Sequence, residues 1–201
     1  MKLLFITEYF PTCPEADIRG GVEARCFYIA KELSKKHDIT VIASREPKTP
    51  EEQMIFGVKV IRCGHPKEYT QSGSFIKRIS FAREAERVGA ELDINLVEGT
   101  NFVTYSAAWK ISQAKKIPCA AWYNDVWIGN WTKHLGIISG LAGEITERSA
   151  LARNWNAIIA NSNTTRDKLV QHGINKNKIT IANTNLLIFS PSPELSETGC
   201  C

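Results

Sequence analysis

The sequence predicts a three-layer α/β domain built on a mostly parallel sheet of about seven strands. Short apolar runs alternate with segments of helical periodicity from the N-terminus to about residue 182. Such alternation is typical of strand–helix–strand units, whose helices cover a parallel sheet. The apolar runs lack the polar–apolar alternation of half-exposed strands, which indicates burial on both faces. A length of 201 residues is that of one such domain.

The predicted strands are short apolar stretches bounded by polar or turn-forming residues. A proline-containing segment at 44–56 interrupts the pattern, and we expect it to form a loop. The expected strands span residues 3–7, 38–43, 57–63, 94–97, 117–122, 157–160 and 178–182.

Helical spacing of apolar residues identifies most of the segments between these strands. In the first helix, Val22 and Cys26 fall on the face that would cover the sheet, and lysines occupy the opposite face. For the last helix we expect Ser162 or Asn163 as the N-cap and Gly173 at the C-terminal end. The expected helices span residues 21–36, 74–88, 101–115, 137–153 and 163–172.

Composition excludes several functional classes. A net charge of +4, from 25 Lys and Arg against 21 Asp and Glu, is too small to indicate nucleic-acid binding. No stretch approaches the ~18 apolar residues of a membrane-spanning helix. The apolar N-terminal run is shorter than a signal-peptide core, so we expect a cytoplasmic protein. Cys26 and Cys119 are expected in the core. The histidines share no ligand spacing, and we predict neither a metal site nor a cofactor.

The predicted helix at 74–88 allows two interpretations. Its interleaved basic and apolar side chains are typical of a helix that lies on a membrane surface. Glu84 and Glu86 dilute the positive charge and favour an ordinary amphipathic helix that covers the sheet. Peripheral membrane contact therefore stays open. The residues concerned are Lys77, Arg78, Arg83 and Arg87 with Phe75, Ile76, Ile79 and Phe81.

Three segments that follow strands carry candidate binding residues, because ligands of an open parallel sheet bind beyond the carboxyl ends of its strands. The first ends in Gly20-Gly21 directly before a helix. Two glycines let backbone N–H groups approach an anion, and the helix N-terminus adds the positive end of its dipole. The segment lacks the G-x-G-x-x-G pattern of dinucleotide-binding domains. Phosphate binding and a plain turn both stay open.

The other two segments combine carboxylate, amide and aromatic groups. Glu98 and Asn101 follow one strand and either bind a polyhydroxy ligand or serve as turn and capping residues. Asn124 and Asp125 follow the next strand, with Trp127 among several aromatic residues close by. Aromatic faces beside amides and carboxylates suit a carbohydrate or a lipid headgroup, whereas packing over the sheet edge is the alternative. Asp125 is the strongest candidate for a general base or a hydroxyl-orienting group.

Several stretches taken together resemble one family. They are residues 6–11, 20–23 and 30–33, residues 157–162 with Thr165 and Leu169, and residues 179–183 with Phe189 and Pro191. In these stretches the chain resembles the N-terminal domain of retaining glycosyltransferases of family 4, which have the two-domain GT-B fold. The resemblance covers nearly all of residues 1–191. It implies a Rossmann-like half of a GT-B fold that takes part in transferring a hexose, with retention, to a hydroxyl acceptor.

The resemblance also implies partners and residue roles. The donor would be a nucleotide sugar such as a UDP- or GDP-hexose, and the acceptor a sugar, a lipid or a small molecule. Family members commonly have a His-Asp pair where this chain has Asn124 and Asp125, and often a histidine where it has Glu98. The implied roles are donor phosphate binding for Gly20 and Gly21, catalysis for Asp125 and Asn124, and acceptor binding for Glu98, Asn101 and Trp127.

Periodicity stops near residue 183, and Ser190-Pro191-Ser192-Pro193 is typical of a linker. We predict an acceptor-side domain at 1–183 and a tail at 184–201 that leads toward a missing C-terminal donor domain. Because that domain would hold most of the nucleotide sugar, we expect this chain to be a fragment that is inactive alone. A standalone sugar- or lipid-head-binding module is the alternative. A dinucleotide-dependent enzyme is disfavoured by the missing glycine pattern.

Overall fold

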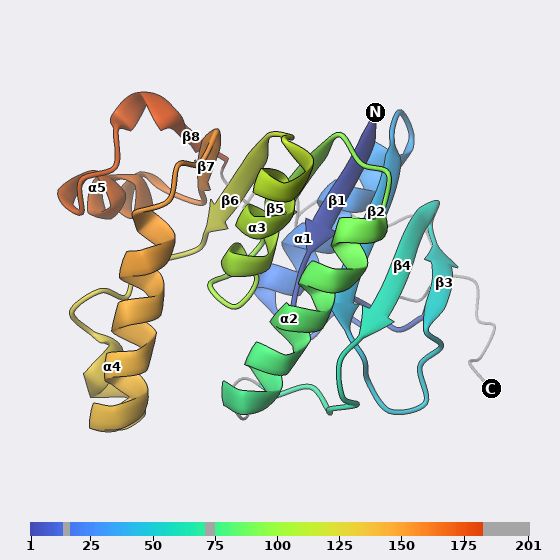
Figure 1. Ribbon diagram of the computed structural model, residues 1–201, viewed down its shortest axis with the longest axis horizontal. Coiled ribbons are helices and arrows are strands. Elements are labelled where there is room, and N and C mark those ends of the chain that lie inside the picture. The colour runs from blue at the N-terminus through green and yellow to red at the C-terminus, as the bar shows by residue number, and fades with distance from the viewer. Residues whose placement is uncertain (14–16, 71–74, 183–201) are drawn as a thin grey trace.

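A mixed sheet of eight strands runs through the described residues, 1–13, 17–70 and 75–182, of the computed structural model (Figure 1). Its order is β3-β4-β2-β1-β5-β6-β7-β8, and every neighbouring pair is parallel except β3 with β4. The strands are β1 (Lys2–Ile6), β2 (Asp38–Ser44), β3 (Glu52–Ile55), β4 (Val58–Cys63), β5 (Leu96–Gly99), β6 (Cys119–Tyr123), β7 (Ala157–Ala160) and β8 (Ile179–Ile181).

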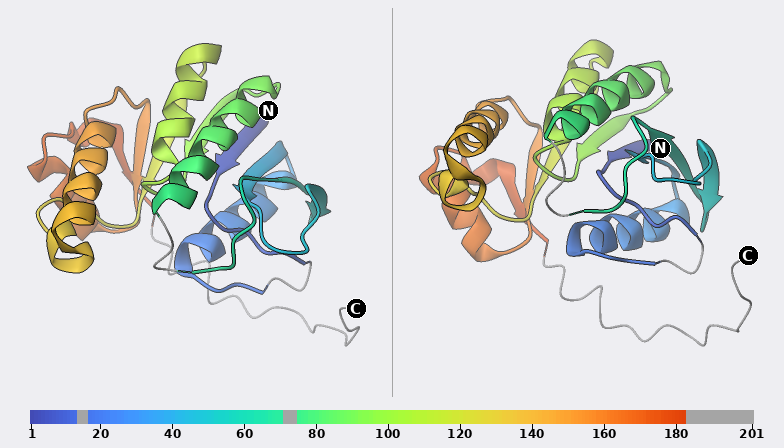
Figure 2. Two further views of the ribbon diagram at one scale, coloured as in Figure 1. Left: turned by 60° about the horizontal axis from the view of Figure 1, so that its bottom comes forward. Right: turned by 90° about the horizontal axis from the view of Figure 1, so that it is seen from below.

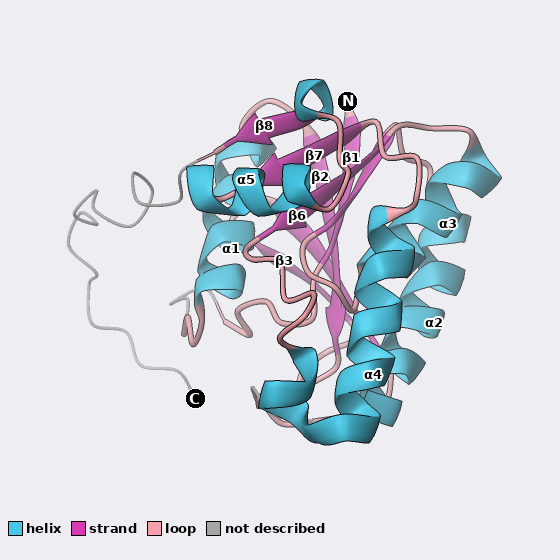
Figure 3. Ribbon diagram, turned by 90° about the vertical axis from the view of Figure 1, so that its left-hand side faces the viewer, coloured by secondary structure: helices cyan, strands magenta, loops and turns pink. Residues whose placement is uncertain are grey.

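Helices cover both faces of this sheet and confirm the predicted three layers. Figures 2 and 3 show α1 on one face and α2, α3 and α4 on the other. Helix α5 packs beside β7 and β8. The helices are α1 (Gly21–Ser34), α2 (Phe75–Glu91), α3 (Tyr105–Lys115), α4 (Trp131–Leu151) and α5 (Asn163–Gln171), with a short 3-10 helix at Lys176–Lys178.

The strand order reverses at β1, and this position determines where a ligand can bind. From β1 the chain passes to β2 and β4 on one side, whereas β5, β6, β7 and β8 follow on the other side. The crossover helices of the two halves lie on opposite faces, so a crevice opens between the carboxyl ends of β1 and β5. Parallel β-sheets with this topology bind their ligands there.

Two hydrophobic cores, one on each face, hold the layers together. The larger lies under α2, α3 and α4 and contains Phe81, Ile111 and Trp155. The smaller lies under α1 and contains Cys26 and Phe27. Cys26 and Cys119 are buried as predicted. Burial of Phe81 and Ala85 against the sheet supports the interpretation of α2 as an ordinary covering helix.

The predicted loop over 44–56 is wrong at its end, where β3 forms an eighth strand. It pairs antiparallel with β4 through a tight turn in which Phe56 has φ 48° and Gly57 has φ 78°. Positive φ at both central residues is the backbone of the two-residue hairpin turn. The strand is missed in the sequence because it lies at the sheet edge and buries only Ile55, the last of its four residues.

Helix α4 begins six residues before the predicted start at 137. Its first residues, 131–135, are separated from the rest by Gly136, whose φ of 75° and ψ of 177° interrupt the helix. The caps predicted for α5 are confirmed: the Ser162 hydroxyl accepts from Thr165 N at 3.1 Å, and Gly173 follows the helix with φ 88°. In the described part of the chain, no helix is long and apolar enough to cross a membrane. The predicted tail at 184–201 lies outside the described residues.

Candidate functional site

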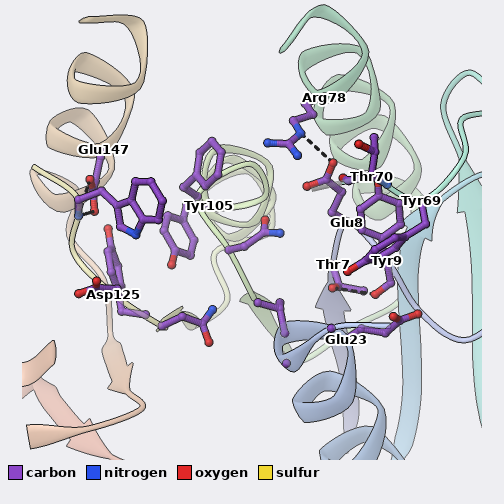
Figure 4. Close-up of a pocket in the computed structure, with 18 of the residues that line it drawn as sticks. Thr7, Glu8, Tyr9, Glu23, Tyr69, Thr70, Arg78, Tyr105, Asp125 and Glu147 are labelled. Carbon is purple, nitrogen blue, oxygen red and sulfur yellow. Dashed lines mark hydrogen bonds and ion pairs between the residues drawn. The ribbon is translucent and has the colours of Figure 1, made fainter. Parts of the chain in front are cut away.

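A pocket of about 400 Å³ lies at the carboxyl edge of the sheet, where the strand order reverses (Figure 4). We call it the strand-end pocket. One wall comes from the end of β1, the start of α1 and the start of α2. The other comes from β6, α3 and α4. The lining residues are Thr7, Glu8, Tyr9, Gly20, Gly21, Val22, Glu23, Tyr69, Thr70, Arg78, Asn101, Phe102, Tyr105, Tyr123, Asn124, Asp125, Trp127, Trp131, Leu135 and Glu147.

The glycine pair forms the part of the pocket at the N-terminus of α1. Gly20 is the N-cap in an extended conformation, and Gly21 is the first helical residue. A Cβ atom on Gly21 would meet no atom within 4 Å, whereas one on Gly20 would lie 2.7 Å from the Tyr69 hydroxyl. The tyrosine donates to the Arg19 carbonyl, so its ring closes one side of the loop. Open space beside the first N–H groups of a helix suits an anion.

Next to this loop, one buried carboxylate is held by two cations. Glu8 Oε1 lies 2.6 Å from Lys67 Nζ and 3.0 Å from Arg78 Nε. Figure 4 shows Glu8 and Arg78 on the same wall of the pocket as Tyr9 and Tyr69. The carboxylate of Glu23, in the first turn of α1, also lines this wall and pairs with Arg19. The dipole of α1 favours an anionic ligand at its start, where each neighbouring carboxylate is already held by a cation.

Asn124 and Asp125 lie together at the opposite wall, as their adjacency in the sequence predicts. Asn124 Oδ1 accepts from Trp122 Nε1 at 2.9 Å. Asp125 Oδ1 accepts from Val126 N at 2.8 Å and forms an ion pair with Lys168 at 2.7 Å. Both contacts use the same carboxylate oxygen, and the side chain is about half exposed at the pocket rim. The arrangement fixes the carboxylate in a position from which it can contact a bound hydroxyl.

Two buried polar atoms of the pocket lack a partner within the described residues. They are the side-chain oxygen Oδ1 of Asn101 and the hydroxyl of Tyr123. Burial raises the pKa of Tyr123 well above its ordinary value, so the hydroxyl stays protonated and can donate. Buried polar groups normally have partners, and those without one in a pocket are suited to bind a ligand. A hydroxylated ligand offers the matching donors and acceptors.

An aromatic wall completes the pocket, and a buried carboxylate holds it. Trp127 and Trp131 lie with ring centroids 5.4 Å apart, and Trp127 is 39% exposed. Glu147 accepts from the Trp127 backbone N–H at 3.2 Å and from the Trp131 indole N–H at 2.6 Å. Burial raises the pKa of Glu147, and the indole hydrogen bond opposes this shift. Exposed aromatic faces of this kind can pack against the apolar face of a sugar ring.

Of the seven site residues predicted from the sequence, all but Glu98 line the pocket. The carboxylate of Glu98 instead pairs with the guanidinium of Arg25, and both side chains are buried. That pair satisfies the hydrogen-bonding capacity for which a ligand was expected. Among the described residues, no group of three or more His, Cys, Asp and Glu is placed to hold a metal ion.

A family model described as Glycosyltransferase Family 4 matches residues 19–184, more than half of the chain. The chain belongs to glycosyltransferase family 4. Among curated proteins, none matches it by sequence. The matched range begins just before the glycine pair and includes the whole aromatic wall, so almost all of the strand-end pocket lies in the family 4 domain.

Solved structures of low sequence identity share the fold of this family 4 domain. Sucrose-phosphate synthase from Thermosynechococcus elongatus is 15% identical with a TM-score of 0.68, covering 95% of this chain and 50% of that one. HepE from Anabaena in complex with UDP-glucose is 13% identical, with a TM-score of 0.57 and coverage of 91% and 43%. UDP-GlcNAc 2-epimerase from Methanocaldococcus jannaschii is 18% identical, with a TM-score of 0.51 and coverage of 90% and 45%. The chain thus spans about half the length of these proteins.

These likenesses show a Rossmann-like half of a GT-B fold and nothing more specific. An epimerase shares it with the synthase, because one fold supports several chemistries. Sequence reasoning missed several lining residues, among them Glu8, Tyr123 and Glu147. Glu8 begins the segment that ends in Gly20-Gly21, and of that segment only the two glycines were predicted to bind a ligand. Glu147 reaches the pocket from the second half of α4, and no local pattern indicates that.

Proposed function

We propose that this chain is the acceptor-side domain of a glycosyltransferase that moves a hexose from a nucleotide sugar to a hydroxyl acceptor with retention. The observation that carries the proposal is one pocket, in a family 4 domain, that combines an anion-binding helix N-terminus with unpartnered groups suited to hydroxyls. The UDP-glucose bound to HepE, which shares the fold, supports a nucleotide sugar as donor. The chain's length relative to these proteins supports a second domain that completes the donor site.

In the proposed reaction the glycine pair supports the leaving group. Backbone N–H groups at Gly20 and Gly21, together with the α1 dipole, stabilise the negative charge that develops on the diphosphate. On the same wall, the Lys67 and Arg78 side chains offset the charge of the Glu8 carboxylate, which would otherwise repel the diphosphate. As the bond from the anomeric carbon to the diphosphate oxygen breaks, the acceptor oxygen bonds to that carbon on the same face.

The opposite wall holds the acceptor. Asn101 and Tyr123 bind acceptor hydroxyls, and Trp127 contacts the apolar face of the acceptor. Asp125 orients the reacting hydroxyl and takes its proton, and Asn124 fixes the strand end through its bond to Trp122. Glu98 takes no part in this scheme because its carboxylate pairs with Arg25.

Two measurements test the proposed function. Because the donor site needs both domains, the 201-residue chain should bind UDP- or GDP-hexoses with a Kd of order millimolar or weaker in calorimetry. Micromolar binding would favour a self-contained binding module. A polypeptide that includes the second domain should release nucleoside diphosphate from the donor only when acceptor is added. NMR of the product would then show the anomeric configuration of the donor. An inverted product would contradict retention.

Asp125→Asn in that longer polypeptide separates the roles at the rim. The carboxylate is half exposed, and an exposed ion pair contributes about 0–1 kcal/mol, so thermal stability should hardly change. Loss of the proton acceptor should lower kcat about 100-fold or more. The matched control is Asp167→Asn, which removes an exposed carboxylate paired with the neighbouring Arg166. Equal activity of both variants would show that the Asp125 carboxylate takes no part in the reaction.

A further inference from the structure

The first part of α4 forms a closed hairpin at one end of the molecule. Gly136 breaks the helix, so that residues 131–135, which precede it, pack against the helical residues that follow it. A Cβ atom on Gly140 would lie 2.4 Å from the Thr132 Cα, and one on Gly143 would lie 2.5 Å from the Trp131 ring. The two glycines therefore allow the segments to touch. The inner side of the hairpin is filled by its own residues, which leaves only the outer side available to a partner.

That outer side is apolar. Ile138, Leu141 and Ile145 recur at helical spacing and share one face, and Leu135 and Ile137 flank the break. Ile137 and Ile138 are 76% and 87% exposed. We call these five residues the α4 apolar face. Contiguous exposed apolar side chains of this extent mark interaction surfaces, because isolated exposure is the norm on a folded protein.

Basic residues lie at the same end of the molecule. Lys133 is exposed within the hairpin itself. Helices α2 and α4 both begin at the carboxyl edge of the sheet, at the lower end in Figure 1. Between residues 75 and 83, α2 carries Lys77, Arg78 and Arg83 and no acidic residue, and Lys77 and Arg83 are exposed. An apolar face, neighbouring tryptophan and flanking lysines are the elements of a segment that lies in a membrane interface.

The apolar face is also continuous with the strand-end pocket. Leu135 belongs to both, and the partly exposed Trp127 ring packs on Trp131 at the pocket side of the hairpin. A bilayer that covered the apolar face would therefore lie beside the pocket mouth. This continuity distinguishes the α4 apolar face from the exposed Met54 of β3 and Val170 of α5, which do not line the pocket.

We propose that the α4 apolar face docks on the surface of a bilayer that contains anionic lipids. Ile137 and Ile138 reach the boundary of the acyl chains, and Lys133 and the basic start of α2 lie near lipid phosphates. Docking presents the strand-end pocket to the headgroup layer. This inference goes beyond the proposed function and does not depend on it. Where both hold, the acceptor hydroxyl belongs to a membrane lipid.

Vesicle flotation with the 201-residue chain, without nucleotide sugar, tests the docking. Vesicles contain either phosphatidylcholine alone or phosphatidylcholine with 30% phosphatidylglycerol. We expect flotation with the anionic vesicles and a loss of partitioning of about 10-fold or more in an Ile137→Ser, Ile138→Ser double variant. A Met54→Ser, Val170→Ser variant removes exposed apolar residues elsewhere and should float like the parent chain. Lys77→Gln with Lys133→Gln should weaken flotation and its dependence on phosphatidylglycerol.

Several outcomes would overturn the proposal. The parent chain staying at the bottom of the gradient would do so, and so would equal flotation of the double isoleucine variant. Light scattering that shows a dimer dissociated by the isoleucine changes, without vesicle binding, would assign the face to self-association. In a longer polypeptide that does not bind vesicles, a lower Tm of the Ile137→Ser, Ile138→Ser variant would show that another segment of the chain covers the α4 apolar face. Sugar transfer to a detergent-solubilised acceptor is measured separately. Its failure alone contradicts the proposed function, and failed flotation alone contradicts the docking.

Discussion

The guanidinium of Arg25 and the carboxylate of Glu98 form a bidentate ion pair that ties α1 to β5 inside the protein. Both side chains are buried, and the guanidinium also lies 3.7 Å from the centre of the Trp122 ring. The pair thus joins a helix on one face of the sheet to two strands, β5 and β6. Because two charges are removed from water together, each depends on the other for its burial.

We expect Glu98→Ala to lower the free energy of unfolding by about 3–5 kcal/mol, because it leaves the Arg25 charge buried without its partner. A double variant, Arg25→Met with Glu98→Leu, should lose less, since it removes both charges and keeps the volume. Urea unfolding at pH 7 measures both. If Glu98→Ala leaves the stability unchanged and abolishes acceptor binding, Glu98 binds the acceptor rather than serving only as the partner of Arg25.

Substitution of Gly21 tests the anion site without disturbing the fold. A side chain there meets open space in the protein, so Gly21→Ala and Gly21→Val should change the Tm little. The same side chain occupies the space that a diphosphate needs. In the longer polypeptide, Gly21→Val should reduce kcat/KM about 10-fold or more, roughly 1.4 kcal/mol of transition-state stabilisation, and Gly21→Ala less.

Gly20, in contrast to Gly21, has no room for a side chain. At Gly20 a new Cβ atom would lie 2.7 Å from the Tyr69 hydroxyl, so Gly20→Ala should displace that ring and lower both stability and activity. Parallel loss of Tm and activity in Gly21→Val would instead favour a plain turn. Full activity of Gly21→Val would show that the glycine pair does not bind the donor diphosphate.

The layers and most elements could be predicted because local periodicity determines them. The runs Leu4–Ile6 and Ala120–Trp122 are buried within strands, as their apolar composition indicates. Edge strand β3 and the first turns of α4 could not be predicted in this way. The strand buries only Ile55, and the first turns of α4 depend on Gly136, which interrupts the helical pattern.

Site residues were predictable where one short segment supplies them, as in Gly20-Gly21 and Asn124-Asp125. A strand-end carboxylate, however, has the same sequence pattern whether it binds a ligand or an arginine. For Glu98 the partner lies 73 residues away in the chain, on a helix of the other layer. Tyr123 directly follows the predicted strand at 117–122, among the aromatic residues near Trp127, and only its unpartnered hydroxyl in the pocket indicates a binding role of its own.

Tyr123→Phe separates binding from stability. The hydroxyl is buried and has no partner in the described part of the chain, so its removal should leave the free energy of unfolding unchanged or slightly higher. If the hydroxyl binds the acceptor, the KM for the acceptor should rise about 10-fold while the KM for the donor stays the same. Tyr28→Phe, on α1 outside the pocket, is the matched control. A clear loss of stability in Tyr123→Phe would show that the hydroxyl is satisfied within the protein.

The last prediction concerns Glu147, which supports the aromatic wall. Because burial raises its pKa above the ordinary value of 4.5, the folded protein binds this proton more tightly than the unfolded chain does. Its contribution to the free energy of unfolding therefore falls as the pH rises from the ordinary pKa through the raised one. Glu144, whose pKa is lowered by the N–H of Gly129, contributes in the opposite direction.

Glu147→Gln keeps an acceptor for Trp127 and Trp131 and removes the charge. We expect it to match or exceed the parent chain in stability at pH 7, with the difference shrinking as the pH falls toward 4. Glu147→Ala leaves two N–H donors without their acceptor and should lose on the order of 1–3 kcal/mol for each. Urea unfolding of the three proteins between pH 4 and pH 7 measures these differences. A pH-independent gap between Glu147→Gln and the parent chain would show that the pKa of Glu147 is the same in the folded protein as in the unfolded chain, and would contradict the raised pKa.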